Sequence, residues 1–169
     1  MPKSITTGAA AYIGLGSNSG ESLQNLNTAL DAIKTITGVR LLAVSQVYRT
    51  EPQGDADQPW FFNQAAKLAL NIKPHELLKE LQKIENNMGR ERDPQRRFGP
   101  RTIDLDILHV DGAKLDTPEL TLPHPRMWER AFVLVPLLDV AGEEFGKQME
   151  AALSRLDYRL DNDKIYQKG

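Results

Sequence analysis

The chain has 169 residues, 40% of them apolar and 26% charged, which is typical of one globular domain spanning residues 1–169. A net charge of −2 is a poor electrostatic match for nucleic acid, and the lack of cysteine excludes disulfides, thiolate metal sites and a cysteine nucleophile. No apolar run approaches the roughly 20 residues of a membrane span, and the N-terminus lacks the apolar core of a signal peptide, so we expect a cytoplasmic protein.

The first predicted elements are a strand, a helix and a second strand. Residues 9–15 form an apolar run that predicts a buried strand, and the glycines up to residue 20 predict a turn. Their spacing matches neither a dinucleotide fingerprint nor a P-loop, so a tight strand-to-helix connection is favoured over a phosphate cradle. Apolar residues at steps of three and four predict a helix over 21–37. Residues 40–49, rich in β-branched and aromatic side chains, predict a strand.

A long loop and another strand come next. Residues 50–60 combine two prolines, a glycine and two aspartates, and loops of about this length are commonly functional or mobile. Residues 61–70 predict a strand on which Phe61 and Asn63 share a face. The pair is open to two interpretations, either a core residue beside a polar strand edge or an aromatic plane beside a hydrogen-bonding amide.

A second amphipathic helix is predicted from Pro74, which suits a first helical turn, to Met88, and Gly89 ends it. Gln82 and Glu85 flank its apolar stripe. Considered alone, both are ordinary solvated helix residues.

The most unusual stretch follows this helix. Five arginines lie within twelve residues, namely Arg90, Arg92, Arg96, Arg97 and Arg101. The strand predicted at 103–107 alternates apolar and acidic residues, which places Asp104 and Asp106 on one face, roughly 7 Å apart. Because arginines bind phosphate oxygens bidentately and carboxylates hold divalent metals, the stretch predicts a site for a polyphosphate with two metal ions. The alternative is a salt-bridge network, which would stabilise the fold little.

The last third of the chain contains less regular patterns. A turn is predicted at 111–112, and His124 lies between two prolines, either as a ligand contact or as a structural residue. Residues 129–140 must be buried, but an internal proline leaves helix and strand both open. A helix around 147–156 and a loose polar tail complete the chain. Adjacent strands without an intervening helix indicate an α+β layout rather than a doubly wound parallel sheet.

The run from Phe98 to Ile107, FGPRTIDLDI, resembles the signature of the 6-hydroxymethyl-7,8-dihydropterin pyrophosphokinases of the folate pathway. Further matches, which fade after about residue 145, are GLGSN at 14–18, YRT at 48–50, DQP at 57–59, Asn63 and PHP at 123–125. The resemblance implies a diphosphotransferase that moves pyrophosphate from ATP to the pterin hydroxymethyl group and releases AMP. It also implies a ferredoxin-like βαββαβ sandwich with a mainly antiparallel sheet, helices packed on it, and C-terminal additions.

The resemblance also assigns site residues. Asp104 and Asp106 would ligate two Mg²⁺ ions, one of which would activate the pterin hydroxyl for in-line attack on the β-phosphorus. Arg90 and Arg101 match the catalytic arginines. The positions that contact ATP are Gln82, Glu85, Arg92, Arg97, Ile107, Thr121, His124 and Arg130. The positions that contact the pterin are Thr50, Phe61, Asn63, Phe98 and Phe132, with Phe61 and Phe132 expected to sandwich the ring.

Some positions depart from the family pattern. Phe98 replaces a common tryptophan and lacks its indole donor, and Glu119 and Pro125 stand where some members carry an arginine and a tyrosine. The arginine loop is one residue longer than in some members, which leaves Arg96 without an assigned role. None of these changes affects the predicted metal ligands or catalytic arginines.

Two other functions could use the same residues. A two-metal nucleotidyltransferase would need the same acids, but the Phe61–Asn63 pair suits a flat heterocycle better. An RNA-binding module built on the arginine loop is disfavoured, because paired acids repel a phosphate backbone. We therefore expect ATP and the pterin as partners, without nucleic acid or membrane. We also expect a monomer, since no long apolar stripe is left over.

Overall fold

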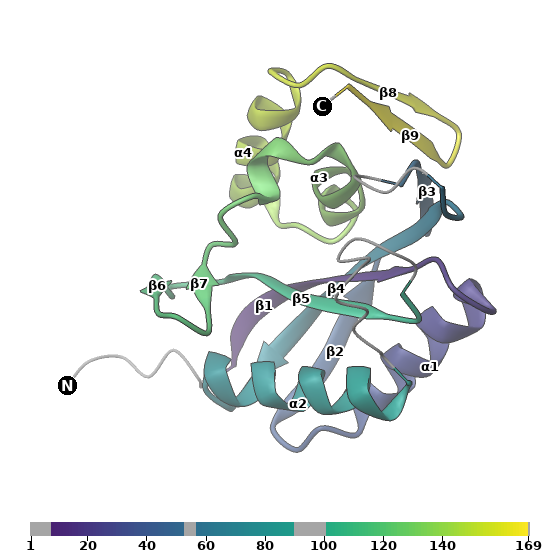
Figure 1. The fold of residues 1–169 in the computed structure, drawn as a ribbon. Coiled ribbons are helices and arrows are strands. Elements are labelled where there is room, and N and C mark those ends of the chain that lie inside the picture. The colour runs from purple at the N-terminus through teal and green to yellow at the C-terminus, as the bar shows by residue number, and fades with distance from the viewer. Residues whose placement is uncertain (1–7, 53–56, 90–100, 169) are drawn as a thin grey trace.

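A computed structural model of the chain describes residues 8–52, 57–89 and 101–168. A central sheet carries helices on both faces (Figure 1). Its strand order is β5–β1–β4–β3–β9–β8, and β2 also pairs with β4. Within the described ranges, no helix is long and apolar enough to span a membrane.

The elements follow the predicted order in the first two thirds of the chain and add to it in the last third. The strands are β1 (Ala9–Ser17), β2 (Val39–Val44), β3 (Tyr48–Thr50), β4 (Phe61–Leu70), β5 (Asp104–Val110), β6 (Leu115–Asp116), β7 (Thr121–Leu122), β8 (Tyr158–Asp161) and β9 (Lys164–Gln167). The helices are α1 (Ser22–Lys34), α2 (Pro74–Asn87), the short 3₁₀ helix η1 (Met127–Glu129), α3 (Ala131–Leu138) and α4 (Glu143–Leu153).

The central strands pair antiparallel, as the α+β prediction requires. β1 pairs with β4 from Ala9–Leu70 to Ser17–Phe62, and with β5 on its other side. β2 and β3 share the far edge of β4, while β9 pairs parallel with β3. The strand that carries the two aspartates therefore lies beside β1 at one end of the sheet.

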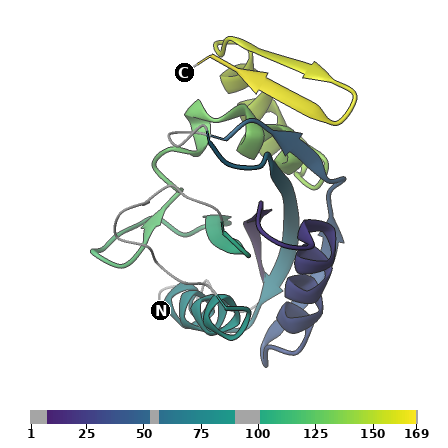
Figure 2. The same ribbon diagram turned by 45° about the vertical axis from the view of Figure 1, so that its right-hand side comes forward.

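Two hydrophobic clusters hold the helices to opposite faces of the sheet (Figure 2). Ile13 of β1 packs with α1 and α2 in the first cluster, whereas its neighbour Tyr12 packs with α3 and α4 in the second. Successive residues of a strand point to opposite faces, so β1 contributes to both clusters. Most of the apolar burial that stabilises the fold lies in these two layers.

Two predicted strand boundaries differ from the structure. β1 continues to Ser17, so Gly14 and Gly16 lie within a strand and not in the predicted turn. Strands on both sides pair with them, and this pairing holds an extended backbone that glycine alone does not indicate. The predicted strand 40–49 is divided into β2 and β3, because the ladder with β4 is interrupted between Val44, opposite Ala66, and Tyr48, opposite Asn63.

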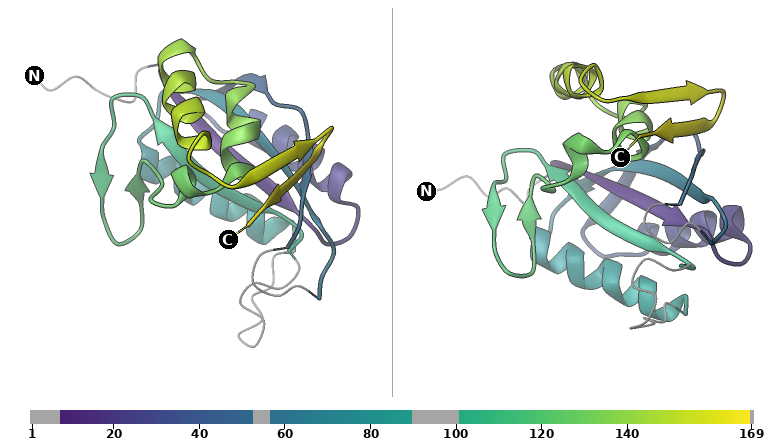
Figure 3. Two further views of the ribbon diagram at one scale, coloured as in Figure 1. Left: turned by 90° about the horizontal axis from the view of Figure 1, so that it is seen from above. Right: turned by 45° about the horizontal axis from the view of Figure 1, so that its top comes forward.

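The C-terminal region differs most from the sequence-based expectation. Residues 129–140 contain helix α3 with Pro136 inside it, and α4 begins at Glu143 instead of near residue 147. The tail predicted to be loose forms the β8–β9 hairpin (Figure 3). β9 pairs through its main chain with β3, and Ile165 is its one fully buried apolar side chain, so the mostly polar composition of the hairpin gave no sign of either strand.

Candidate active site

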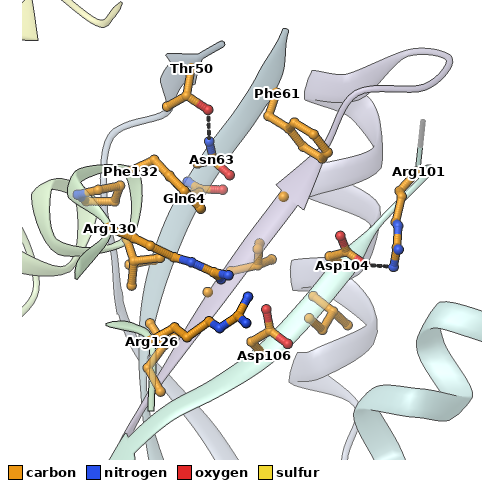
Figure 4. Close-up of a pocket in the computed structure, with 18 of the residues that line it drawn as sticks. Thr50, Phe61, Asn63, Gln64, Arg101, Asp104, Asp106, Arg126, Arg130 and Phe132 are labelled. Atoms are coloured by element: carbon orange, nitrogen blue, oxygen red, sulfur yellow. Dashed lines mark hydrogen bonds and ion pairs between the residues drawn. The ribbon is translucent and has the colours of Figure 1, made fainter. Parts of the chain in front are cut away.

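One cavity of about 670 Å³ brings most of the predicted site residues together (Figure 4). Strands β1, β4 and β5 line it from the sheet, and α2, α3 and the segment 126–130 line its sides. The predicted residues that line it are Thr50, Phe61, Asn63, Gln82, Glu85, Arg101, Asp104, Asp106, Arg130 and Phe132. The predictions for Arg90, Arg92, Arg96, Arg97 and Phe98 lie outside the described residues.

Three predicted ATP contacts do not line this cavity. Ile107 is buried in the cluster beneath the sheet with α1 and α2. Thr121 belongs to the small β6–β7 sheet, where it pairs with Asp116. His124 is half-buried next to the cavity wall, and its charge state depends on Asp106 and on Arg130.

The two aspartates leave β5 on the cavity side. In the ladder with β1, Asp104 is opposite Gly16 and Asp106 is opposite Gly14. Directly opposed residues share a face of the sheet, so both carboxylates stand above positions that carry no side chain. Figure 4 shows both side chains projecting from β5 into the cavity, near Arg101 and Arg126.

This donor set suits magnesium. Mg²⁺ prefers oxygen ligands, keeps several waters, and is usually held by one or two carboxylates together with substrate phosphates. Asp104 and Asp106 supply two such carboxylates on the same cavity. Among the described residues there is no group of three or more His, Cys, Asp or Glu that could hold a metal ion.

Arg101 is fixed at its backbone by Asn18. The Arg101 amide donates to Asn18 Oδ1 at 2.7 Å, and the Asn18 amide donates to the Arg101 carbonyl at 3.0 Å. The side-chain amide of buried Asn18 also donates to Gln58 Oε1 and to the Pro59 carbonyl. Arg101 Nη1 lies 3.3 Å from Asp104 Oδ1. One buried amide therefore connects the start of β5 to the end of the 50–60 loop.

Glu85 connects helix α2 to the aspartate strand. It is only 5% exposed, and its Oε2 accepts the Leu105 amide at 2.9 Å, between the two aspartates. The sequence pattern classed it as a solvated helix residue, and the structure shows a buried acceptor that also lines the cavity.

Replacing Glu85 with alanine is expected to lower the free energy of unfolding by about 1–3 kcal/mol, because the Leu105 amide loses its acceptor in a buried position. Glu85→Gln keeps an acceptor oxygen and is expected to lose less. Glu80→Ala, which removes a surface pair with Lys83, serves as the control and should change stability by about 0.5 kcal/mol or less. Urea unfolding measures all three. Equal losses for Glu85→Ala and Glu80→Ala would contradict this role.

His124, Arg126 and Arg130 form a cationic edge next to Asp106. His124 Nδ1 lies 3.3 Å from the Arg126 amide and accepts from it, which leaves Nε2 as the protonated nitrogen of the neutral ring. Burial lowers the pKa of His124, Asp106 opposes this shift, and Arg130 and Arg126 add to it. Burial and then Arg126 likewise lower the pKa of Arg130. The clustering of positive charge favours an anionic ligand.

The His124 ring is expected to titrate below pH 6.5 and to carry its proton on Nε2 when neutral. Since its pKa is lowered in the folded state, the folded protein binds fewer protons there than the unfolded chain does. The His124 contribution to stability is therefore present above pH 6.5, and it is lost as pH falls from there through the lower pKa of the folded state. Long-range ¹H–¹⁵N NMR of the ring measures both properties, and loss of the signal in His124→Asn assigns it. A midpoint at or above 6.5 would contradict the burial argument.

The other end of the cavity presents an aromatic and amide surface. Asn63 Nδ2 donates to Thr50 Oγ1 at 2.8 Å, and both residues are buried. Phe61 and Phe132 come from β4 and α3 and lie on opposite sides of this end (Figure 4). A Cβ atom at Gly16 would lie 3.0 Å from Asn63 Oδ1, so glycine there keeps space beside the amide. The surface suits a flat ligand with hydrogen-bonding edges.

Several cavity residues were not predicted from the sequence. Gly14 and Gly16 were read as a turn, and Arg126, Glu129 and Gln167 received no role, although all line the cavity. Arg126 follows His124 by two residues, and this proximity was the one available signal. Glu129 and Gln167 are brought together only by the C-terminal hairpin.

Comparison with known proteins shows which family the chain resembles. A 2-amino-4-hydroxy-6-hydroxymethyldihydropteridine pyrophosphokinase of Methylorubrum extorquens is 44% identical over 149 residues, covering 87% of this chain and 93% of the relative. A Pseudomonas aeruginosa protein of the same name is 49% identical over 130 residues, covering 77% of this chain and 79% of the relative.

Solved structures show the same fold at lower sequence identity. A crystal structure of a Plasmodium falciparum HPPK-DHPS protein matches 95% of this chain with a TM-score of 0.63 and 15% identity. This chain spans 51% of that protein. The model of the family described as 7,8-dihydro-6-hydroxymethylpterin-pyrophosphokinase (HPPK) matches residues 12–142. The chain therefore belongs to the 7,8-dihydro-6-hydroxymethylpterin-pyrophosphokinase family.

Proposed function

We propose that this protein transfers pyrophosphate from ATP to the hydroxymethyl group of 6-hydroxymethyl-7,8-dihydropterin, as a step of folate biosynthesis. The observation that carries the proposal is the cavity, in which an aspartate pair and arginines lie opposite an aromatic and amide surface. A polyphosphate suits the charged end, and a pterin ring suits the other. Family membership supports the same pairing of substrates.

In the proposed reaction, the pterin hydroxyl oxygen bonds to the β-phosphorus of ATP as the bond from that phosphorus to the α,β-bridging oxygen breaks. AMP leaves with the bridging oxygen, and the hydroxyl proton is released. Such transfers depend on alignment and on stabilisation of phosphate charge more than on a covalent catalyst. The protein's part is to hold both substrates in line.

Two Mg²⁺ ions are proposed to be held by Asp104 and Asp106. When bound with ATP, they would neutralise phosphate oxygens and make the pterin hydroxyl more acidic. Arg101, 3.3 Å from Asp104, is suited to hold a phosphate oxygen beside these carboxylates. Arg90, predicted as the second catalytic arginine, is proposed to act with it, and Arg92 and Arg97 are proposed to contact ATP.

The pterin is proposed to lie between Phe61 and Phe132, with its edge against Asn63. The bond from Asn63 to Thr50 fixes the amide plane, which favours one orientation of the ring. Gln82, Glu85, Ile107, Thr121, His124 and Arg130 are proposed on the ATP side. Ile107 and Thr121 could act there only through their main chain or after a shift, because their side chains lie outside the cavity.

The strand order β5–β1–β4–β2/β3, with α1 and α2 on one face, supports a ferredoxin-like core. We also propose one domain, a monomer and a cytoplasmic location, without nucleic-acid partners. Light scattering of the purified protein tests the monomer.

The activity is tested by incubating the protein with ATP, Mg²⁺ and 6-hydroxymethyl-7,8-dihydropterin and separating the nucleotides. The expected products are AMP and the pterin diphosphate in equal amounts. ADP would indicate transfer of a single phosphate, and free pyrophosphate would indicate a nucleotidyltransferase. Either product, or no turnover, would refute the proposal.

A further inference from the structure

The start of helix α3 is completed by a residue from the far end of the chain. The helix begins at Ala131 after an N-cap, Arg130, whose side chain makes no capping hydrogen bond. First-turn amides of a helix have no partner within the helix and need one elsewhere. Gln167 Oε1 accepts the Ala131 amide at 2.7 Å, and Gln167 Nε2 donates to the Glu129 carbonyl at 2.7 Å. The side-chain amide of Gln167 therefore bonds to the main chain of the residues before and after Arg130.

Strand β9 holds Gln167 firmly in place. It pairs parallel with β3, where Thr50 is opposite Ile165. Next to it, the Arg49 guanidinium pairs with Asp163 through two contacts, at 2.9 and 3.1 Å. Ile165 is 2% exposed and packs in the cluster with α3 and α4. The Gln167 amide is thus positioned relative to the strand that ends at Thr50.

The segment 129–131, which Gln167 holds by its two hydrogen bonds, lies at one wall of the cavity. Arg130 and Phe132 flank Ala131, and the Arg130 guanidinium carbon lies 5.6 Å from the centre of the Phe132 ring. Both residues line the cavity, as do Glu129 and Gln167 themselves. The backbone at 129–131 therefore sets the positions of a cation on the charged side and of an aromatic ring on the flat-ligand side.

We infer that the β8–β9 hairpin contributes to substrate binding. Its Gln167 acts as a positioning residue that fixes the backbone from which Arg130 and Phe132 enter the cavity. The inference rests on the proposed function. The match to the family model ends at residue 142 and does not include this hairpin. A purely stabilising role would be shared by other hairpin contacts, such as Arg159, whose guanidinium lies 4.3 Å from the Tyr166 ring centre. Positioning through 129–131 is specific to Gln167.

The test compares Gln167→Ala, Gln167→Glu and the control Arg159→Ala. Gln167→Ala is expected to raise KM for both ATP and the pterin about tenfold, from the loss of two hydrogen bonds, with kcat changed less than about threefold. Gln167→Glu can still accept from Ala131 but cannot donate to Glu129, so an intermediate effect is expected. Arg159→Ala should lower the melting temperature yet leave both KM values within about twofold of wild type.

A second measurement does not depend on turnover. Binding of α,β-methylene-ATP with Mg²⁺, followed by calorimetry, should weaken about tenfold in Gln167→Ala and stay unchanged in Arg159→Ala. Amide exchange at Ala131 should become faster only in the Gln167 variants. Wild-type KM and analogue binding in Gln167→Ala, or equal losses in Gln167→Ala and Arg159→Ala, would overturn the inference. Wild-type protein that makes no pterin diphosphate would instead refute the proposed function, while analogue binding would still decide the role of Gln167.

Discussion

Asp106→Asn and Asp104→Asn are each expected to lower kcat about a thousandfold while leaving the fold intact. Asparagine keeps the shape of aspartate but loses the negative charge that, in the proposed site, would hold Mg²⁺ beside the phosphates. Asp106 is exposed in the cavity, so its replacement costs little stability. Asp104 also pairs with Arg101, so its replacement disturbs a second group. Initial rates at saturating ATP and pterin measure the effect, and circular dichroism checks the fold.

The control for these variants is Asp116→Asn, an identical change on the exposed strand β6, away from the cavity. It should retain wild-type kcat. If the lost charge is a metal ligand, as proposed, raising the Mg²⁺ concentration should restore part of the activity of the Asp104 and Asp106 variants, whereas it should not affect Asp116→Asn. Near-full activity of either cavity variant would contradict the metal assignment.

Arg101→Ala is expected to reduce kcat about a hundredfold to a thousandfold, the range seen when one preorganised group that stabilises transition-state charge is removed. Asn18 bonds to both the main-chain amide and the carbonyl of Arg101. The Arg101 guanidinium is therefore preorganised beside Asp104 before substrate binds. Steady-state rates with ATP and pterin varied in turn separate kcat from KM.

The comparison variant is Arg101→Lys, which keeps the positive charge but loses the planar fork. We expect it to recover only part of the lost rate, because a single ammonium cannot bind two phosphate oxygens in the same way. A fully active Arg101→Lys would mean that charge alone suffices, and a fully active Arg101→Ala would remove Arg101 from the catalytic group.

The parts of the fold set by local pattern were predictable from the sequence. Strand β4 and helix α2 lie within a residue of their predicted bounds. The alternation at 103–107 predicted Asp104 and Asp106 on one face of a strand, and both line the same cavity. These predictions succeeded because each depends on a period of two or 3.6 residues within one segment.

Features that depend on contacts between distant segments were missed. The glycines of β1 are held extended by strands on both sides, and the polar hairpin is ordered by its pairing with β3. Glu85 looks solvated on a helical wheel, yet its side chain is buried and accepts the amide of Leu105 from the neighbouring strand β5. Gln167 is separated from Ala131 by 36 residues, and no local pattern indicates that one completes the helix begun by the other.

The candidate site was predicted in part for the same reason. Residues assigned by resemblance, such as Thr50 and Phe132, do line the cavity, whereas Ile107 and Thr121 do not. A linear motif reports which positions matter in a family, but not whether a side chain or its backbone does the contacting. Arg126 shows the converse, since it lines the cavity beside Arg130 and belongs to none of the matched motifs.

The most direct test of the central claim is the fate of the β-phosphorus. ATP labelled with ³²P at the β-position, incubated with the protein, Mg²⁺ and 6-hydroxymethyl-7,8-dihydropterin, should transfer its label to the pterin diphosphate and leave unlabelled AMP. Label that remains in ADP would show transfer of the γ-phosphate alone, and label released as pyrophosphate would show nucleotidyl transfer. Either result would contradict pyrophosphate transfer by the site built around Asp104 and Asp106.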